Sequence, residues 1–328
     1  MHILVLGAAG MVGRKLVERL VHDGCLGDSA ITRLTLQDVV APTKPEKVGY
    51  PVNIVAGDFA VPGFAKTLVA GRPDVIFHLA AIVSGEAELD FDKGYRINLD
   101  GTRMLFDAVR LVGDGYRPRL VFTSSIAVFG APFPQQIGDE FFHTPLTSYG
   151  TQKSICELLI ADYSRKGFLD GIGIRLPTIC VRPGRPNKAA SGFFSNIIRE
   201  PLAGHEAVLP VGDDVRHWHA SPRSAVGFLL HAGTMDLAAM GARRNLSMPG
   251  LSVTVGEQIA SLERVAGKAV VARIRRETDP VIAGIVSGWP RDFVTDRALK
   301  LGFTTAEKTF DDIIRIHIED ELGGNFAA

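Results

Sequence analysis

Tyr149 and Lys153, four residues apart in YGTQK, form the pair in this sequence with the clearest chemical potential. On a helix, residues i and i+4 lie one above the other, so an ammonium would lie beside a phenol. A free tyrosine has a pKa near 10, and a nearby cation favours its phenolate. Lowering that pKa to about 7 requires roughly 4 kcal/mol, at about 1.4 kcal/mol per pKa unit. Such pairs also occur by chance on surface helices, so the meaning of this one depends on its position in the fold.

Ser125 ends the apolar segment RLVFTSS, which is typical of a buried strand. In open parallel sheets, ligands bind at the carboxyl ends of the strands. A hydroxyl there can hold a substrate oxygen while Tyr149 exchanges its proton and a hydride moves between a substrate carbon and a nicotinamide. The arrangement therefore favours acid–base chemistry coupled to hydride transfer.

The segment GAAGMVG contains Gly7, Gly10 and Gly13, follows an apolar strand and opens a helix. Glycine permits a tight turn and a close approach of the backbone to a pyrophosphate, which would lie over the helix N-terminus. Glycines are common in loops, so the triplet alone is weak evidence for a dinucleotide site.

Two aspartates strengthen this interpretation. Asp38 ends the next strand in LTLQDVV, where its carboxylate can accept hydrogen bonds from the adenosine ribose. An acid there repels the 2′-phosphate of NADP, so NAD is expected as the cofactor, with NADP as the weaker choice. Asp58 in VAGDF follows the third strand and is placed for the adenine edge; the alternative is a turn or helix cap.

The elements that must position these residues alternate between strands and helices. Apolar runs predict strands at residues 2–6, 34–40, 52–56, 74–80, 119–124 and 171–176, and helical spacing predicts helices at 12–21, 97–112 and 149–165. Strands that are apolar on both faces predict an α/β fold with a doubly wound parallel (Rossmann) sheet. We expect residues 1–176 to form mainly the dinucleotide-binding domain and 177–328 a smaller, loop-rich substrate lobe, interleaved with the first.

Composition excludes several other classes of protein. The 328 residues are 46% hydrophobic and contain 36 basic and 36 acidic side chains, which gives no electrostatic case for nucleic acid or an anionic membrane. No apolar run is long enough for a membrane helix. Three scattered cysteines favour a reducing cytoplasm and, with the histidines, lack zinc-ligand spacing, so no metal is expected.

The motifs GAAGMVG, HLAA, INLDGT, TSSIAVFG and YGTQK occur in order and resemble those of the extended short-chain dehydrogenase/reductases, the group that holds nucleotide-sugar epimerases. The resemblance continues to WPRDFVTDRALKLGF and implies that Ser125, Tyr149 and Lys153 are catalytic, with Asn98 supporting Lys153. It also suggests a homodimer. The implied cofactor-binding residues are Gly7, Gly10, Met11, Val12, Gly13, Asp38, Asp58, Phe59, Leu79, Ala80, Ala81, Asn98, Tyr149, Lys153 and Pro177.

Departures from the motifs of the family narrow the range of reactions that this chain can be expected to catalyse. Nucleotide-sugar dehydratases of the family carry Asp-Glu where Ile126 and Ala127 stand here, so dehydration is disfavoured. The Tyr-Gly-Pro expected after the sixth strand is replaced by CVRPG at residues 180–184, which casts doubt on a nucleotide-sugar pocket. Segments such as YGTQKSICELL, RLPTICVRPGRPNKAASGF and MPGLSVTVGE are similar to the D-erythronate dehydrogenase group. That likeness implies oxidation of the C2 hydroxyl of a small sugar acid to a 2-keto acid, with NAD preferred.

A sugar-acid substrate needs a cation for its carboxylate, ideally the planar fork of arginine. Arg182 and Arg185 are the preferred candidates, although each is also explained by a solvated surface charge. Ser84 is expected to contact the substrate from the loop that borders the nicotinamide, as are Ser125 and Tyr149. Arg199 and Arg216 are further candidates for the carboxylate, and Lys188 is a cation with less exacting geometry. Further candidates for polar contacts are Asn187, Ser191 and Asn196.

Two other functions remain open on the sequence. A nucleotide-sugar epimerase of the same fold would return the hydride to the opposite face of its substrate. A non-catalytic dinucleotide-sensing protein is the third hypothesis, although such proteins usually lack the pair seen in Tyr149 and Lys153.

Overall fold

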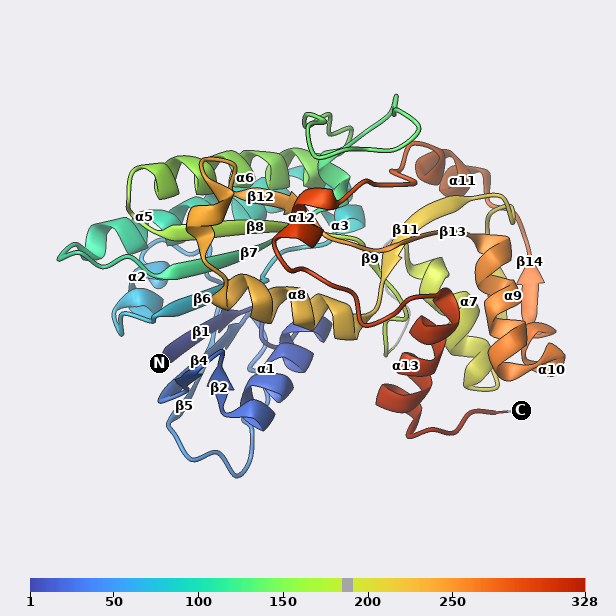
Figure 1. The fold of residues 1–328 in the computed structure, drawn as a ribbon, viewed down its shortest axis with the longest axis horizontal. Helices are drawn as coiled ribbons and strands as arrows, with labels where there is room; N and C mark the ends of the chain where they lie inside the picture. The colour runs from blue at the N-terminus through green and yellow to red at the C-terminus, as the bar shows by residue number, and fades with distance from the viewer. Residues whose placement is uncertain (185–190, 328) are drawn as a thin grey trace. The chain divides into compact units, whose positions relative to one another are not determined.

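A computed structural model describes residues 1–184 and 191–327 of this chain. The chain forms two compact units (Figure 1). Unit 1 comprises residues 1–128, 147–175 and 226–246, and unit 2 comprises 129–146, 176–225 and 247–328. Each unit is thus assembled from three separate segments of the chain.

Unit 1 is organised around a seven-stranded sheet with the strand order β12-β8-β7-β6-β1-β4-β5. The pairs β1–β4, β4–β5, β1–β6 and β6–β7 are parallel. The chain starts in the middle of the sheet, builds outward to β5, and then returns to place β6 on the other side of β1. The predicted doubly wound sheet is therefore confirmed, with its switch point between β1 and β6. The strands are β1 (His2–Leu6), β4 (Arg33–Asp38), β5 (Val52–Ala56), β6 (Val75–His78), β7 (Arg119–Ser125), β8 (Asp170–Leu176) and β12 (Asn245–Ser247).

Helices cover both faces of this sheet (Figure 1). On one face, α2 (Phe64–Val69), α5 (Thr102–Val112) and α6 (Ser148–Arg165) form a core with the strands, which includes Leu4, Ile76, Phe106, Leu120 and Ile160. On the other face lie α1 (Met11–Asp23) and the C-terminal part of α8 (Pro222–Thr234). Burial from both sides explains why the strands are continuous apolar runs.

Several boundaries differ from those predicted. The strand expected at residues 34–40 ends at Asp38, since Val39 and Val40 are 69% and 66% exposed. The strand expected at 74–80 ends at His78. The helix expected at 97–112 is a π-helix, η1 (Tyr95–Gly101), continued by α5. The short helices α3 (Ser84–Leu89), α4 (Phe91–Gly94), η2 (Ile126–Val128) and η3 (Leu237–Met240), and the strands β2 (Cys25–Leu26) and β3 (Ser29–Ala30), were not expected.

Unit 2 has smaller sheets and its own apolar core. Its three-stranded sheet has the order β13-β11-β9, and β10 pairs with β14 in parallel. Helices α7 (Gly192–Leu202), α9 (Val255–Ala266) and α13 (Phe310–Leu322) enclose buried side chains such as Phe194, Leu262 and Ile313. The remaining elements are β9 (Thr178–Ile179), β10 (Ala207–Leu209), β11 (Arg216–Ala220), β13 (Leu251–Thr254), β14 (Ile274–Arg276), α10 (Lys268–Val271), α11 (Pro280–Ser287) and α12 (Asp296–Lys300). Among the residues described, no helix is both long and apolar enough to cross a membrane.

Candidate functional site

The loop between β1 and α1 brings two glycines into contact with other backbone. Gly7 has φ +86°, and a Cβ built on it would lie 2.7 Å from the Ala80 nitrogen in the loop that follows β6. A Cβ on Gly13 would lie 2.1 Å from the Gly7 carbonyl oxygen. Because real Cβ atoms do not approach backbone this closely, a side chain at either position would force the loop apart.

Helix α1 begins directly after this loop. Gly10 is its N-cap, and no side chain there bonds to the first turn. The N–H groups of Met11, Val12 and Gly13 belong to that turn, where α-helical geometry offers no intrahelical partner. Donors of this kind, together with the positive end of the helix, suit the pyrophosphate of a dinucleotide. The close packing at Gly7 and Gly13 and the N-terminus without a side-chain cap therefore fit the cofactor that the sequence predicts.

Asp38 lies beside this loop at the end of β4. Its Oδ2 accepts a hydrogen bond from the Ala9 N–H at 2.9 Å, and its Oδ1 accepts one from the Val39 N–H at 2.7 Å. The carboxylate is thus held next to the glycine loop and remains partly exposed, as a ribose contact requires.

Asp58 has other partners. Its Oδ2 lies 2.6 Å from Arg96 Nη1, and its Oδ1 accepts the Ala60 N–H at 2.9 Å. This is the bonding of a turn residue, so its adenine contact stays a prediction. The neighbouring Phe59 side chain is 4% exposed and packs edge-on against His78 in the core.

Asn98 fixes the loop that follows β6, which contains Leu79, Ala80 and Ala81. Its Oδ1 accepts the Ile82 N–H at 2.9 Å, and its Nδ2 donates to the Ile82 carbonyl at 3.2 Å. The same Nδ2 donates at 2.8 Å to Gln152 Oε1 on α6. Asn98 thereby ties the loop to the helix that carries Tyr149 and Lys153.

Tyr149 and Lys153 lie on the first two turns of α6, as the i, i+4 spacing requires. The helix begins after Thr147, whose side chain accepts the Gly150 N–H at 3.0 Å, and the Ser148 N–H donates to Glu88 Oε2 at 2.9 Å. The Lys153 Nζ lies 5.6 Å from the centre of the Tyr149 ring. The fold therefore places the cation beside the phenol.

Lys153 is almost fully buried, at 2% exposure. Its ammonium donates to the Thr123 carbonyl oxygen at 2.8 Å and lies 4.4 Å from the Phe122 ring centre. Burial lowers the pKa of this lysine to about 8, while the Cys156 and Glu157 groups oppose that shift. The side chain therefore stays a cation at neutral pH and loses its charge as the pH rises through this value.

Ser125 ends β7, two residues after Thr123. Its Oγ accepts the Ala127 N–H at 3.1 Å, which fixes the oxygen at the start of the turn η2. A hydroxyl that accepts in this way keeps its own proton for donation to another oxygen. Ser125 and the Lys153 ammonium thus both lie at the carboxyl end of β7.

The predicted substrate residues are distributed over both units. Ser84 is the first residue of α3 and is partly buried. In unit 2, Arg182 donates from Nη2 to Ser191 Oγ and from Nε to the Ile179 carbonyl, each at 3.0 Å. Pro177 is buried directly after β8. Arg185, Asn187 and Lys188 lie outside the described residues.

The other candidate arginines are engaged in ion pairs. Arg199 Nη2 lies 2.6 Å from Glu200 and 2.7 Å from the Asn196 side-chain oxygen, and Arg216 pairs with Glu257 at 3.3 Å. These contacts hold both guanidiniums within unit 2.

The buried residues His78 and His217 have the bonding of structural histidines. His78 Nε2 lies 2.8 Å from Thr102 Oγ1, and burial lowers its pKa to about 3. His217 bonds to Thr178 at 2.7 Å and to the Pro290 carbonyl at 2.8 Å, and burial lowers its pKa to about 4. Within residues 1–184 and 191–327, no group of three or more His, Cys, Asp or Glu could hold a metal ion.

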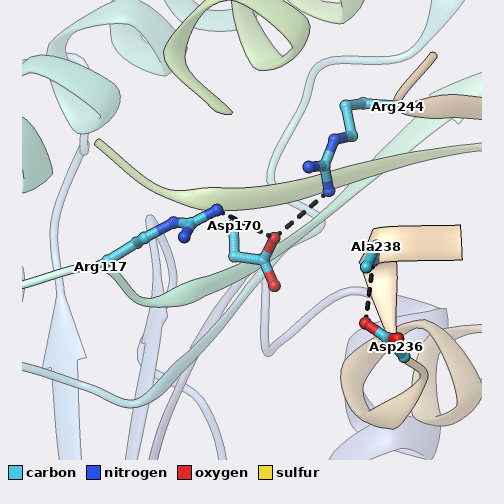
Figure 2. A pocket seen from close by; sticks show the side chains of 5 residues that line it. All are labelled: Arg117, Asp170, Asp236, Ala238 and Arg244. Atoms are coloured by element: carbon cyan, nitrogen blue, oxygen red, sulfur yellow. Dashed lines mark hydrogen bonds and ion pairs between the residues drawn. The ribbon is translucent and has the colours of Figure 1, made fainter. Parts of the chain in front are cut away.

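A polar pocket of about 350 Å³ lies at the amino ends of β7 and β8 (Figure 2). Asp170 lies at its centre, 3.7 Å from Arg117 and 3.3 Å from Arg244. Since Ser125 ends β7 at the opposite edge of the sheet, this pocket is separate from the catalytic residues. Its lining residues are Arg117, Asp170, Asp236, Ala238 and Arg244.

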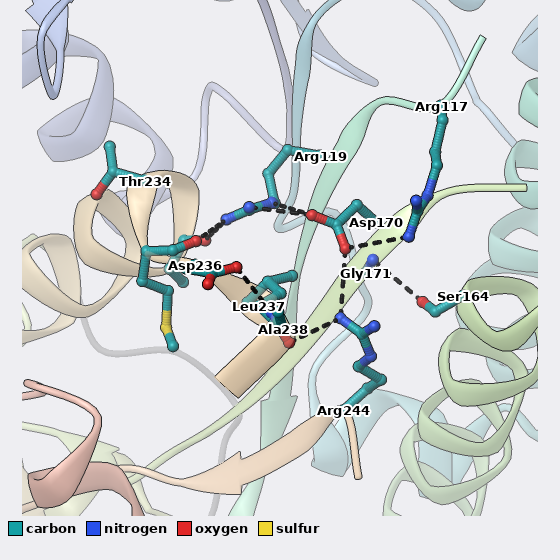
Figure 3. Close-up of polar contacts among 12 residues, drawn as sticks. Arg117, Arg119, Ser164, Asp170, Gly171, Thr234, Asp236, Leu237, Ala238 and Arg244 are labelled. Carbon is teal, nitrogen blue, oxygen red and sulfur yellow. Dashed lines mark hydrogen bonds and ion pairs between the residues drawn. The ribbon is translucent and has the colours of Figure 1, made fainter. Parts of the chain in front are cut away.

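The pocket residues bond mainly to one another and to backbone (Figure 3). Arg119 pairs with Asp170 at 3.0 Å and donates at 2.9 Å to the carbonyls of Ala232 and Met235. Arg244 also donates to the Leu237 carbonyl at 3.4 Å. This network joins β7 and β8 to the segment after α8, so a structural role accounts for it.

Sequence reasoning missed three residues around the catalytic group: Thr123, Gln152 and Glu157. Thr123 acts through its backbone, for which no side-chain pattern exists. Gln152 and Glu157 are 0% exposed on α6. The one sequence signal for their burial is that both are polar residues on the helix that carries Lys153.

Comparisons with known proteins identify the relatives of this chain. The model of the NAD dependent epimerase/dehydratase family matches residues 3–221. The chain is 45% identical over 324 residues to a D-erythronate dehydrogenase from Cupriavidus necator, covering 98% of both chains. It is 40% identical over 322 residues to one from Haemophilus influenzae, covering 98% of this chain and 100% of that one. A crystal structure described as a nucleoside-diphosphate-sugar epimerase from Agrobacterium tumefaciens has 66% identity and a TM-score of 0.97, covering 99% of this chain and 95% of that chain.

Proposed function

This chain belongs to the NAD-dependent epimerase/dehydratase family, and from that premise we propose that it oxidises the C2 hydroxyl of D-erythronate, or of a similar small sugar acid, to the 2-keto acid. The observation that carries the proposal is the likeness, over 98% of the chain, to two D-erythronate dehydrogenases. The pairing of Tyr149 with a buried Lys153 ammonium supplies the chemistry that such an oxidation needs.

In this proposal a bound nicotinamide would supply the acceptor for the hydride that leaves C2. Tyr149, as phenolate, takes the proton of the C2 hydroxyl, so the substrate loses one hydride and one proton and becomes a ketone. Lys153 favours the phenolate through its positive charge. Ser125 donates a hydrogen bond to the substrate oxygen and keeps it in line with Tyr149.

The dinucleotide would be held mainly by residues 1–176. Gly7, Gly10, Met11, Val12 and Gly13 would hold the pyrophosphate. Asp38 would bind the adenosine ribose and select NAD over NADP. The remaining proposed contacts are Asp58, Phe59, Leu79, Ala80, Ala81, Asn98, Tyr149, Lys153 and Pro177.

For the substrate carboxylate we propose Arg182, because the planar guanidinium of arginine can bind a carboxylate at two points. Arg182→Met should raise the KM for the sugar acid at least tenfold and leave the KM for NAD unchanged. Arg216→Met is the matched control. Equal effects of the two substitutions on KM would remove Arg182 from this role. Arg185 and Ser84 remain further proposed contacts.

A nucleotide-sugar epimerase is the second candidate, because the Agrobacterium structure carries that description. The two functions differ in net redox change. A dehydrogenase releases one NADH for each substrate oxidised, whereas an epimerase retains its cofactor and forms an isomer without net NADH.

The test is to incubate the purified protein with NAD and a panel of four- to six-carbon sugar acids, and separately with UDP- and GDP-sugars. We expect steady NADH formation with D-erythronate and no isomer of any nucleotide sugar. No NADH with any sugar acid would refute the proposal. An isomerised nucleotide sugar would establish the epimerase, and cofactor binding without turnover on either panel would favour a dinucleotide-sensing protein. The homodimer and the cytoplasmic location remain predictions.

A further inference from the structure

A second ionised group lies one helical turn beyond Lys153. Glu157 is on α6 and is 0% exposed, and Arg175 on β8 faces it. The Arg175 Nη2 lies 2.7 Å from Glu157 Oε2, and its Nε lies 2.9 Å from Oε1. This two-point arginine–carboxylate geometry is the strong form of an ion pair.

The same carboxylate also reaches the strand that carries the catalytic serine. Ser124 on β7 donates from its Oγ to Glu157 Oε1 at 2.5 Å, and Ser124 is 3% exposed. Ser124 stands between Thr123, whose carbonyl accepts from the Lys153 ammonium at 2.8 Å, and Ser125. Helix α6 and strand β7 are therefore joined at two adjacent points, one of which is made by Glu157.

We propose that Glu157 is a positioning residue for proton transfer: through Ser124 it holds the end of β7, with Ser125 and the Thr123 carbonyl, in register with the helix that carries Tyr149 and Lys153. The proposal rests on the proposed function, since it concerns the same catalytic groups. Arg175 holds the Glu157 carboxylate in its orientation toward β7 through the two-point contact.

The Glu157–Arg175 ion pair also influences the pKa of Lys153. The titratable and charged groups around this lysine are Tyr149, Cys156 and Glu157 on α6, His78 on β6, and Arg175 on β8, which pairs with Glu157. Burial lowers the pKa of Lys153, and the carboxylate of Glu157 raises it. Removing one member of a buried ion pair leaves the other uncompensated. Loss of Glu157 alone should therefore disfavour the Lys153 ammonium, and loss of Arg175 alone should favour it.

The first experiment follows Lys153 in the protein without substrate. Lysines labelled with ¹³C at Cε are titrated by NMR, and the Lys153 resonance is assigned from its absence in Lys153→Arg. We expect Lys153 to titrate at lower pH in Glu157→Gln, at higher pH in Arg175→Met, and close to the wild-type pH in the double variant. A Lys153 titration that is the same in all four proteins would overturn the electrostatic part of the proposal.

The second experiment uses a variant that keeps the ion pair and so avoids a buried unpaired charge. Ser124→Ala should lower kcat about tenfold in the NADH assay without changing the KM for NAD, and Ser124→Thr, which keeps the hydroxyl, should recover most of the rate. Wild-type kcat in Ser124→Ala would overturn the positioning role. If the wild-type protein produces no NADH but the NMR shifts occur as stated, the proposed function fails and the Glu157 linkage stands.

Discussion

The Lys153 ammonium donates a 2.8 Å hydrogen bond to the carbonyl oxygen of Thr123, two residues before Ser125. One end of this contact is on helix α6 and the other is on strand β7, so it fixes the position of the cation relative to the strand that carries the serine hydroxyl. The Tyr149 ring centre lies 5.6 Å from the same nitrogen. The catalytic hypothesis depends on this single buried charge.

Tyr149→Phe should abolish the base while keeping the aromatic ring and the other proposed cofactor contacts. We expect kcat for sugar-acid oxidation to fall at least 10³-fold, within the range for loss of a general base. The affinity for NADH, measured by fluorescence, should fall far less than kcat, because the proposed pyrophosphate and ribose contacts remain. Tyr163→Phe is the control, since Tyr163 lies on the same helix but bonds to Asp107 at 2.9 Å. Comparable losses in both variants would indicate that the helix, rather than the phenol, matters.

Lys153→Met should have opposite effects on catalytic activity and on stability. Because burial lowers the pKa of Lys153 to about 8, the folded protein loses this proton at a lower pH than the unfolded chain does. Between that pH and about 10.5 the unfolded state binds more protons, so stability rises with pH in this window. At pH values below this window, the buried ammonium lowers the free energy of unfolding by up to about 3 kcal/mol.

The expected result is that Lys153→Met loses turnover yet raises the free energy of unfolding at pH 7, by an amount that shrinks by pH 10. Denaturant unfolding at the two pH values measures this difference. Lys166→Met, which removes an exposed lysine at the end of the same helix, should show no such dependence. A gain at pH 7 that persists undiminished at pH 10 would contradict the assignment of the cost to a buried charge.

The sequence was sufficient for the sheet and for the glycine loop because both follow local rules. Strands apolar on both faces, such as His2–Leu6, can be stable only between two layers of helices. Gly7, Gly10 and Gly13 mark a turn before a helix, and the helical period places Tyr149 over Lys153. These features need no knowledge of distant contacts.

What the sequence left undetermined depends on residues far apart in the chain. Arg175 lies in a predicted strand and has the character of a surface charge until β8 places it against Glu157. Ser124 looks like a neighbour of the catalytic serine, although its partner is on α6. The segment at 95–101 also forms a π-helix rather than a regular α-helix. Tertiary packing decides each of these, so local periodicity could not predict them.

Gly13→Ala should disrupt the glycine loop, since its Cβ would lie 2.1 Å from the Gly7 carbonyl oxygen. We expect a loss of about 1–3 kcal/mol in unfolding free energy, typical of overpacking, and a fall in NAD affinity of at least tenfold. Gly227→Ala is the matched control, because it is also in a helix and a Cβ there meets nothing within 4 Å. It should gain up to about 1 kcal/mol from helix propensity. Unaltered NAD binding by Gly13→Ala, measured by calorimetry, would exclude this loop as the pyrophosphate site.

Asp38→Ala should change the choice of cofactor. The carboxylate is held beside the glycine loop by the Ala9 N–H at 2.9 Å, where it would accept from the ribose hydroxyls of NAD and repel the 2′-phosphate of NADP. Removing it should lower kcat/KM for NAD and raise it for NADP, so that their ratio shifts by at least tenfold, about 1.4 kcal/mol. Asp58→Ala is the control, since its carboxylate pairs with Arg96 at 2.6 Å and is proposed to contact adenine, which the two cofactors share. That variant should change both cofactors equally. If the ratio stays the same in Asp38→Ala, the ribose contact must be made elsewhere, because no other effect of the substitution distinguishes two dinucleotides that differ only in one phosphate.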